Sequence, residues 1–553
     1  MTSRYVFHLP QHYNLRGFER ELAYLELQTL VGSQVEKSNC SFTLYTDSKI
    51  DPALLRRLTF IERVEVVNGT EIEVIEPLQV NVDRTAAADK AVVSNNLDLL
   101  PSLQVKRRTH NYLTHSLHQY KGKFYPQIAK SLINYAGLDP GSVVLDPFCG
   151  SGTTLVECLL NGYRGLGVDL NPLAVLVTRA KVETLLLDAR ELESEVNALI
   201  NRVQQQFRQA KLWDQGIDDL IWTFKEIEPS ISLDHIQVPN KEYLITWFEP
   251  AALAKLVFIC GEIERVPDER IQNFAKVVLS DIVRDYSLQV PDQLRVRRRK
   301  TPPDHTDLLL KYRAKLRKHT QSAYRAAVLG LHERQDVPPV EVFQADVTKL
   351  NRSLSEYFRH DGRVDAIITS PPYATALPYI DTDRLSLFFL DLIKKNERKN
   401  LEWNMIGNRE ITQGKRQELE EEFLNSYGTA PLPTAVKALI GEVLERNAQA
   451  NVGFRRKNKA SLLYKYFKAM REAFIQFHRV LKPGGSCAVI IGNNKTTAGG
   501  KLIEIPTDDF LIEIGENVGF RLVKRLPMTD QAAYMAHSKN VIDTETIFVL
   551  KRT

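Results

Sequence analysis

The sequence has few of the features that mark secreted, zinc-binding or membrane proteins. It contains five cysteines in 553 residues, and none of them forms a C-x-x-C pair. An odd number of scattered cysteines predicts neither a disulfide framework nor a zinc site. No uncharged apolar run is long enough to span a bilayer, and the first residues lack the apolar core of a signal peptide. We therefore expect a cytoplasmic protein with no metal and no membrane partner.

The whole chain also has little excess of one charge sign, because its net charge is only +5. This value permits a nucleic-acid partner, but the distribution of charge is the better guide. A hydrophobic content of 43% and a charged content of 25% are typical of globular proteins. The length is sufficient for two or three domains.

The stretch from Val143 to Thr154, VVLDPFCGSGTT, organises the chain. It predicts a buried strand that ends at Asp146, a tight turn, and a helix capped by the two threonines. In the turn, Gly150 and Gly152 let the backbone approach a ligand closely because they have no Cβ. The cysteine in this turn is expected to be a small buried residue.

Two later strands are also predicted to end at carboxylates. They span residues 165–169 and 340–346 and end at Asp169 and Asp346. In nucleotide-binding sheets, an acidic residue at the tip of the second strand holds ribose hydroxyls. Helix capping or a surface salt bridge is the alternative role for both residues.

Three motifs together resemble those of the amino-group DNA methyltransferases. Residues 146–154 are similar to the S-adenosylmethionine (SAM) motif of that family. Residues 369–373, Thr-Ser-Pro-Pro-Tyr after a predicted strand at 364–368, are similar to its catalytic motif. Residues 115–126 resemble the segment over the methionine end of SAM. The Ser-Pro-Pro-Tyr form is typical of cytosine-N4 enzymes, whereas adenine-N6 enzymes usually have Asp first.

The resemblance implies a fold, a cofactor and a set of site residues. The expected fold is α/β, with a Rossmann-like methyltransferase core built on a doubly wound mixed sheet, and the expected cofactor is SAM. The residues expected to bind the cofactor are Phe124, Asp146, Pro147, Phe148, Gly150, Gly152, Thr153, Asp169 and Asp346. The residues expected to act in catalysis are Ser370, Pro371, Pro372 and Tyr373.

The chemistry of an exocyclic amine explains why these catalytic residue types are suitable. The amine is a poor nucleophile because its lone pair is delocalised into the ring. The Ser370 hydroxyl and the Pro371 carbonyl can accept hydrogen bonds from it, and the prolines stiffen the loop that holds them. Tyr373 offers an aromatic face to a base flipped out of double-stranded DNA.

The chain divides into five predicted segments. Residues 1–80 form a small α/β module whose layout is similar to the N-terminal part of some tRNA guanine-N2 methyltransferases; a packing or docking module is the alternative. Residues 393–460 are expected to be charged and irregular. The remaining segments are a linker at 81–110, the two parts of the methyltransferase core at 111–184 and 336–553, and a largely helical insertion at 185–335.

A basic stretch lies inside the insertion. Ten of the 24 residues from Arg295 to Lys318 are Lys or Arg, and only Asp304 and Asp307 oppose them. Phosphate contact is the favoured interpretation, and a solvated face is the alternative. The insertion is therefore the leading candidate for target recognition. The residues expected at the nucleic acid are Arg295, Arg297, Arg298, Arg299, Lys300, Lys311, Arg313 and Lys315.

We expect a SAM-dependent cytosine-N4 DNA methyltransferase of the restriction-modification type. Three alternatives remain: an adenine-N6 enzyme, an RNA (tRNA) guanine-N2-type methyltransferase, and a non-catalytic SAM- or nucleic-acid-binding protein. The intact Asp146, Ser370 and Tyr373 argue against the last of these. No nuclease motif is found, so a restriction endonuclease partner would be a separate chain. His115 and His118 are expected to be packing or substrate-loop residues and not metal ligands.

Overall fold

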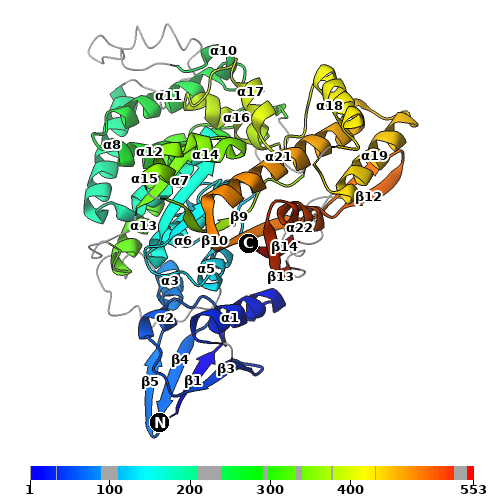
Figure 1. Ribbon diagram of the computed structural model, residues 1–553. Coiled ribbons are helices and arrows are strands. Elements are labelled where there is room, and N and C mark those ends of the chain that lie inside the picture. Colours follow the sequence, from blue (N-terminus) through cyan, green and yellow to red (C-terminus); the bar gives the residue numbers. More distant parts are fainter. Residues whose placement is uncertain are drawn as a thin grey trace.

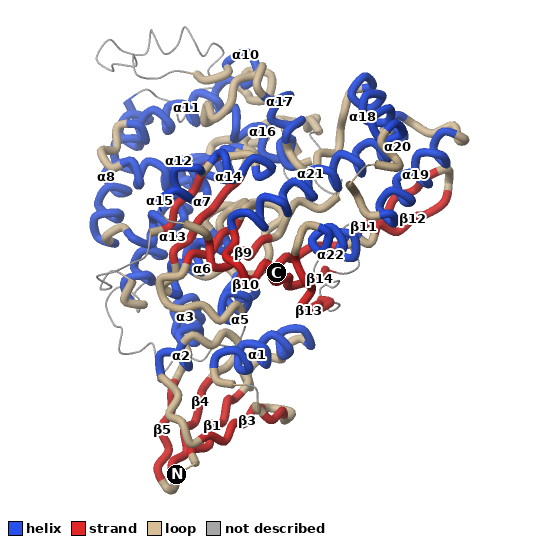
Figure 2. The backbone as a smooth tube through the Cα atoms, in the orientation of Figure 1, coloured by secondary structure: helices blue, strands red, loops and turns tan. Residues whose placement is uncertain are grey.

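The computed structural model describes residues 2–32, 34–88, 110–209, 238–290, 297–331, 339–360, 362–374, 378–429, 431–528 and 545–553. A small N-terminal sheet lies at one end of a larger α/β core (Figure 1). Helices cover the core sheet, and a group of helices with a hairpin extends from its C-terminal half (Figure 2).

The N-terminal module is an antiparallel sheet with helix α1 (Gly17–Leu30) packed on it, and it contains the strands and the helix that the sequence predicts. Its apolar residues alternate along the strands, so one face is buried under α1. Helix α2 (Pro52–Arg56) connects two of the strands. The order is β2 (Glu36–Lys37), β3 (Ser41–Thr46), β1 (Ser3–His8), β4 (Arg63–Asn68) and β5 (Glu71–Ile75).

The segment predicted to be a linker begins instead as helix α3 (Leu78–Ala87). The linker prediction rested on polar composition, but several of these polar side chains are buried and paired. Gln79 donates to Asp83 at 3.2 Å and accepts from Lys130 of the core at 3.3 Å. The helix therefore docks on the core, and residues 89–109 lie outside the described part of the chain.

The core is a seven-stranded sheet in which only β14 is antiparallel to its neighbours. A mostly parallel sheet with helices packed on it agrees with the predicted Rossmann-like methyltransferase core. The carboxyl ends of the parallel strands share one edge, where ligands bind in open α/β sheets. The order is β13 (Phe520–Met528), β14 (Glu545–Arg552), β10 (Leu481–Gly492), β9 (Val364–Thr369), β6 (Val143–Asp146), β7 (Arg164–Asp169) and β8 (Val340–Gln344).

Both faces of the core sheet are buried, which explains the continuous apolar runs of its strands. On one face, Val144 and Ile368 pack in a cluster with α5 (Pro126–Tyr135) and the N-terminal module. On the other face, Leu145 and Ile367 pack in a cluster with the long helix α21, to which α22 also contributes. The bounds of the remaining covering helices are α6 (Thr153–Asn161), α7 (Pro172–Leu186), α21 (Lys459–Val480) and α22 (Thr507–Asn517).

The insertion is helical, as predicted, and it shares an apolar core with α7 and with α16 (Tyr379–Phe389). It therefore belongs to the body of the core and covers one side of it. Its helices are α8 (Ala189–Gln209), α10 (Lys241–Leu244), α11 (Pro250–Glu264), α12 (Glu269–Val283) and α13 (Leu308–Val328).

The prediction of irregular structure for residues 393–460 is wrong, because this segment is largely helical. Apolar residues at helical spacing, such as Val436, Ile440 and Val443, face α21, although charged residues surround them in the sequence. The hairpin of β11 (Asn494–Ala498) and β12 (Lys501–Ile505) was not predicted either. The helices are α17 (Arg398–Asn404), α18 (Gln413–Asn425), α19 (Thr434–Ala448) and α20 (Phe454–Lys457).

Four short helices complete the described elements: η2 (Leu113–Ser116), η3 (Val347–Lys349), α14 (Leu350–Ser353) and α15 (Ser355–His360). Within the described ranges, no helix is both long and apolar enough to cross a membrane.

Candidate active site

The turn between β6 and α6, residues 147–152, is named here the glycine turn. Gly150 and Gly152 both have positive φ, at 49° and 78°. A Cβ on Gly152 would lie 2.5 Å from Cγ2 of Thr178, so the turn requires glycine there for space as well as for its backbone angles. Gly152 is itself the N-cap of α6, and it makes no side-chain cap. The predicted threonine cap is therefore wrong.

Asp146 joins the glycine turn to the TSPPY loop, residues 369–373. Its carboxylate accepts from the Thr154 hydroxyl at 2.7 Å, from the Thr369 hydroxyl at 2.6 Å and from the Phe148 amide at 3.2 Å. Burial raises the pKa of Asp146 to about 6, although these hydrogen bonds oppose the shift. The side chain is 1% exposed. Asp146 therefore positions the two predicted motifs against each other.

A second carboxylate cluster lies at the end of β7. Asp169 accepts from the Gly150 amide at 2.9 Å and from the Asn171 amide at 2.8 Å. The Asn171 side chain donates to Asp383 of α16 at 2.8 Å. Burial raises the pKa of Asp169 to about 6 and that of Asp383 to about 7. Two carboxyl groups are thus held close to the glycine turn, and Asp383 was not predicted.

Tyr120 is a further site residue that the prediction missed, although it lies in the segment 115–126. A Cβ on Gly150 would lie 3.3 Å from the Cε1 atom of Tyr120. The side-chain amide of Asn171 lies 3.5 Å from the Tyr120 hydroxyl. Burial, together with the charges of Asp169 and Asp383, raises the pKa of Tyr120 well above its usual value. It is Tyr120 that contacts the turn, while Phe124 is half-buried against the core beside the N-terminal module.

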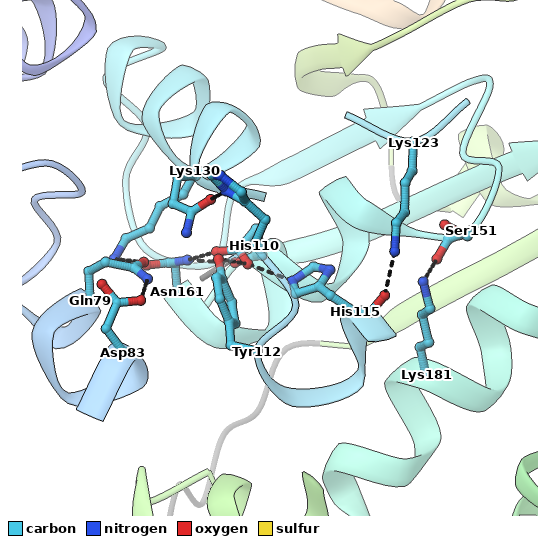
Figure 3. A network of polar contacts seen from close by, with 12 residues as sticks. Gln79, Asp83, His110, Tyr112, His115, Lys123, Lys130, Ser151, Asn161 and Lys181 are labelled. Atoms are coloured by element: carbon cyan, nitrogen blue, oxygen red, sulfur yellow. Dashed lines mark hydrogen bonds and ion pairs between the residues drawn. The ribbon is translucent and has the colours of Figure 1, made fainter. Parts of the chain in front are cut away.

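Buried polar contacts hold this overlying segment in place (Figure 3). Glu157 of α6 accepts from the Tyr112 hydroxyl at 2.7 Å and contacts Nε2 of His115 at 3.0 Å. Lys181 of α7 donates to the Ser151 carbonyl of the glycine turn at 2.8 Å. His118 contacts the Ser280 hydroxyl at 3.2 Å. The two histidines are packing residues here, and Lys181 helps to fix the turn.

Asp346, just after β8, lines a cavity of about 160 Å³. It caps η3 by accepting from the Thr348 amide at 2.9 Å. Gly407, in the cavity wall, has a φ of +80°, and a Cβ there would lie 2.9 Å from the Cβ of Pro372. The cavity is lined by Asp346, Thr348, Trp403, Asn404, Met405, Ile406, Gly407, Asn408, Leu462, Lys465, Tyr466 and Ala469.

The TSPPY loop is held from several directions. Tyr466 of α21 donates to the Pro372 carbonyl at 2.9 Å, and the Asn494 side chain donates to the Ala374 carbonyl at 2.5 Å. The Tyr373 amide donates to the Tyr379 hydroxyl at 3.4 Å. No described residue donates a hydrogen bond to the Pro371 carbonyl. This carbonyl is therefore available to accept from a substrate.

Tyr373 is fixed at its hydroxyl group. It donates to Oε1 of Glu545, the first residue of β14, at 2.6 Å. Burial raises the pKa of Tyr373 well above its usual value, and the Glu545 charge adds to the shift, while a hydrogen bond from Ser370 opposes it. Ser370, Tyr373 and Glu545 are thus connected at the TSPPY loop, although Glu545 is distant from the other two residues in the sequence.

The basic segment of the insertion is only partly free to contact a ligand. Lys311 pairs with Asp285 at 2.7 Å, and Lys315 pairs with the nearly buried Asp281. The Arg299 guanidinium donates to the backbone carbonyls of Gln289 and Asp285, at 2.8 and 2.7 Å. Besides the two acids within the stretch, Asp281 of α12 and Asp285, just after this helix, therefore also oppose the run.

The other predicted basic residues differ in exposure. Arg297, Arg298 and Lys300 are exposed, and Arg313 is half-buried. Arg295 lies outside the described residues.

The two carboxylates beside Asn171 predict a pH dependence of stability. Because the pKa of Asp383 is raised from 3.8 to about 7, the folded protein retains a proton that the unfolded chain releases across this window. The free energy of unfolding should therefore contain a contribution that falls as the pH rises from about 4 to about 7. Asp383→Asn should flatten this slope, as measured by urea unfolding at several pH values. An equal slope in both proteins would contradict the placement of Asp383.

The chain is similar to known DNA methyltransferases. The family described as DNA methylase, of the N6/N4 type, matches residues 84–178. The Type II methyltransferase M.MjaII of Methanocaldococcus jannaschii is 27% identical over 33% of this chain and 41% of its own length. M.MvaI of Kocuria varians is 25% identical over 73% of this chain and 81% of its own. These matches support a relationship of the chain to the amino-group DNA methyltransferases, which use S-adenosyl-L-methionine as their cofactor.

The chain is also similar to a tRNA methyltransferase over a short segment, and a solved structure superposes on it only distantly. A tRNA (guanine(10)-N2)-dimethyltransferase of Methanothermobacter thermautotrophicus is 34% identical over 15% of this chain and 27% of its own length. The crystal structure of TrmN from Thermus thermophilus is 10% identical, covers 100% of both chains, and superposes with a TM-score of 0.29.

Proposed function

We propose that this protein transfers the methyl group of SAM to the exocyclic N4 of cytosine in a specific sequence of double-stranded DNA. The observation that carries the proposal is the TSPPY loop, which has Ser370 as its acceptor side chain and is tied to the glycine turn through Thr369 and Asp146. The loop and the turn thus face the same edge of the sheet. Alignment of an amine with the methyl donor is the main requirement of this chemistry.

The residues present fit the cofactor. The glycine turn packs too closely against Thr178 to admit a Cβ at Gly152, and Asp169 stands where ribose hydroxyls are held in nucleotide-binding sheets. Asp346 and the cavity beside it are suited to the adenine, because a carboxylate can accept from its amino group. Pro147, Phe148 and Thr153 flank the turn, and Phe124 precedes α5. When bound, SAM supplies an activated methyl group on a sulfonium.

The chain's own residues would then orient the target amine. Ser370 and the Pro371 carbonyl accept hydrogen bonds from it, which favours a more tetrahedral nitrogen whose lone pair is free to attack. The flanking prolines and the three anchoring hydrogen bonds keep these acceptors in place before the substrate arrives. The Tyr373 ring, fixed through its hydroxyl, offers a face for the flipped base.

The helical insertion is proposed to recognise the target, with phosphate contacts from its exposed basic residues. Replacement of Arg297, Arg298 and Lys300 by Ala should weaken DNA binding about equally for all sequences. It should also lower the slope of log affinity against log salt by roughly one unit for each lost phosphate contact. The measurement is a salt titration of DNA binding by fluorescence anisotropy.

The matched control removes three exposed cations near the opposite edge of the sheet, Arg363, Arg479 and Arg521. This control variant should keep the salt dependence of the unmodified protein. If the two variants lose slope equally, the basic segment has no special part in binding.

Mass spectrometry of digested DNA from a host that expresses the protein tests the proposed function. N4-methylcytosine at a defined sequence supports it. N6-methyladenine without N4-methylcytosine would overturn the choice of base and leave the family assignment intact. The companion restriction endonuclease, expected as a separate chain, should cut the same sequence only when it is unmodified.

RNA amino-group methylation is the second candidate, and two observations favour it. One is the short but 34% identical match to a tRNA (guanine(10)-N2)-dimethyltransferase. The other is the N-terminal module, which packs on the core through α1 and α5. Methylated RNA with unmodified DNA from the same host would promote this candidate and would assign RNA docking to the module.

A further inference from the structure

Glu545 is a carboxylate at the reacting edge of the sheet that the motifs do not contain. It is the first residue of β14, which runs antiparallel to β10, so it lies at the edge where the parallel strands end. It pairs across with Gly492, the last residue of β10. Tyr373 reaches past β10 to donate to Glu545 at 2.6 Å. The TSPPY loop is thus connected directly to a carboxylate more than 170 residues away in the sequence.

The polar contacts that join Ser370, Tyr373 and Glu545 run in one direction, from the serine hydroxyl toward the carboxylate. The Tyr373 hydroxyl donates to Glu545, and an interaction with the Ser370 hydroxyl lowers the pKa of Tyr373, which places Ser370 beside the Tyr373 oxygen as a donor. The lone pairs of Ser370 therefore remain to accept a hydrogen bond from the target amine. Hydrogen bonds in such a chain strengthen one another, because each donor becomes a better acceptor as its own proton is drawn away.

Methyl transfer creates a proton that the loop itself cannot keep. As the amine nitrogen bonds to the methyl carbon, the carbon–sulfur bond breaks and its electron pair stays on sulfur. The product nitrogen then carries one proton too many. A serine hydroxyl and a proline carbonyl are too weakly basic to hold this proton near neutral pH, and an ionised carboxylate within reach is a suitable acceptor for it.

We propose that Glu545 is the final acceptor of this proton, which leaves the amine through the Ser370 and Tyr373 hydroxyl groups. The inference rests on the proposed function. The nitrogen gives a proton to Ser370 as Ser370 gives its own to Tyr373, and Tyr373 gives its own to the Glu545 carboxylate. The products are the neutral methylated amine, S-adenosylhomocysteine and a protonated Glu545, so atoms and charge balance. Solvent then removes the proton from Glu545.

The other carboxylates at this edge are less suited to the task. Asp146 is 1% exposed and already accepts from two threonine hydroxyls and a backbone amide. Asp169 and Asp383 are bound to Gly150 and Asn171 on the side of the glycine turn. Glu545 is the carboxylate that accepts from the Tyr373 hydroxyl, whereas the Thr369 hydroxyl of the same loop donates to Asp146.

The groups around Glu545 determine the pKa of its carboxyl group. Burial raises the pKa of Glu545 above its usual value, and the hydrogen bond from Tyr373 opposes the shift. Arg525 of β13 lies opposite Phe548 of β14 and pairs with Asp508 and Asp509 of α22, and Thr546, next to Glu545, also donates to Asp508. Tyr373 and Tyr379 are the titratable groups that approach from the loop side. The rate should therefore fall at low pH, as Glu545 becomes protonated.

Glu545→Gln tests the proposal, because the amide can still accept from Tyr373 but cannot take a proton. The single-turnover methylation rate should fall about 100-fold, in the range expected for loss of a general base. The part of the low-pH decline that belongs to Glu545 should disappear. Saturating SAM removes the effect of Asp169 and Asp383 on cofactor binding from this profile. Tyr373→Phe should slow the reaction similarly, because it interrupts the same connection.

Glu504→Gln, on the exposed strand β12, is the matched control and should behave as the unmodified protein does. Glu545→Asp should recover part of the rate. An unchanged rate in Glu545→Gln overturns the proposal, and so does a slower rate with an unchanged pH profile, which would show that Glu545 only positions Tyr373. Absence of methyl transfer by the unmodified protein would instead overturn the proposed function.

Discussion

Ser370→Ala should lower the single-turnover methylation rate by about 100-fold or more, the range found when one preorganised polar contact to a transition state is removed. The hydroxyl acts on the transferring amine and not on the cofactor. The affinity for SAM should therefore stay the same, because the lost contact belongs to the transition state only. Rapid-quench measurement of methyl transfer, together with calorimetry of SAM binding, tests both parts.

Ser370→Thr is the matched control for this prediction, because it keeps a hydroxyl group at the same place in the loop. It should retain more activity than Ser370→Ala. The assignment of Ser370 would be wrong if the alanine variant bound SAM more weakly by the same factor as it lost rate. Such a result would mean that the residue supports the glycine turn through Thr369 and Asp146.

The parts of the fold that the sequence predicts well are those with strong local patterns. The buried strands and the glycine turn depend on short apolar runs and on backbone angles that glycine adopts easily, so the local sequence is sufficient. Residues 393–460 show the opposite case. Their helices bury narrow apolar stripes against α21, and the many charged residues on the other faces hide the spacing.

The site shows the same division between local and long-range information. Asp169 and the TSPPY loop follow predicted strands, so their position at the sheet edge can be deduced. Asp383 and Glu545 reach the site only because α16 and β14 return to it. No motif spacing connects them to the glycine turn or to Tyr373. The acidic partners of Lys311 and Lys315 were missed for the same reason, since Asp281 lies on α12 and Asp285 just after it.

Tyr120 is the exception, because a local signal was present. It stands in the segment that resembles the family's cover over SAM, and aromatic residues are common beside glycine turns that they shield. The prediction placed Phe124 there instead. The structure shows that the chain turns between these two residues, at Gly122 with a φ of 81°, so only Tyr120 reaches Gly150.

Gly152→Ala should greatly weaken SAM binding, and Gly162→Ala should not. The two glycines have nearly the same backbone conformation, with φ and ψ of 78° and 29° for Gly152 and 78° and 30° for Gly162. The left-handed conformation should cost each alanine variant about 1–2 kcal/mol of stability. A Cβ at Gly162 meets nothing within 4 Å, whereas a Cβ at Gly152 would lie 2.5 Å from Thr178. Any additional loss in Gly152→Ala therefore comes from this contact.

Thr178 connects a clash at Gly152 to the binding of SAM. Its hydroxyl donates to the Gly150 carbonyl at 2.8 Å, so a displaced Thr178 releases the glycine turn that is proposed to hold SAM. We expect SAM affinity to fall at least about tenfold, equivalent to about 1.4 kcal/mol, as measured by calorimetry. Thr178→Ala in the Gly152→Ala background removes the overlapping atoms, so the double variant should lose less affinity than the sum of the two single variants. Additive losses would show that the overlap with Thr178 is not the cause, and that the backbone angle alone explains the requirement for glycine.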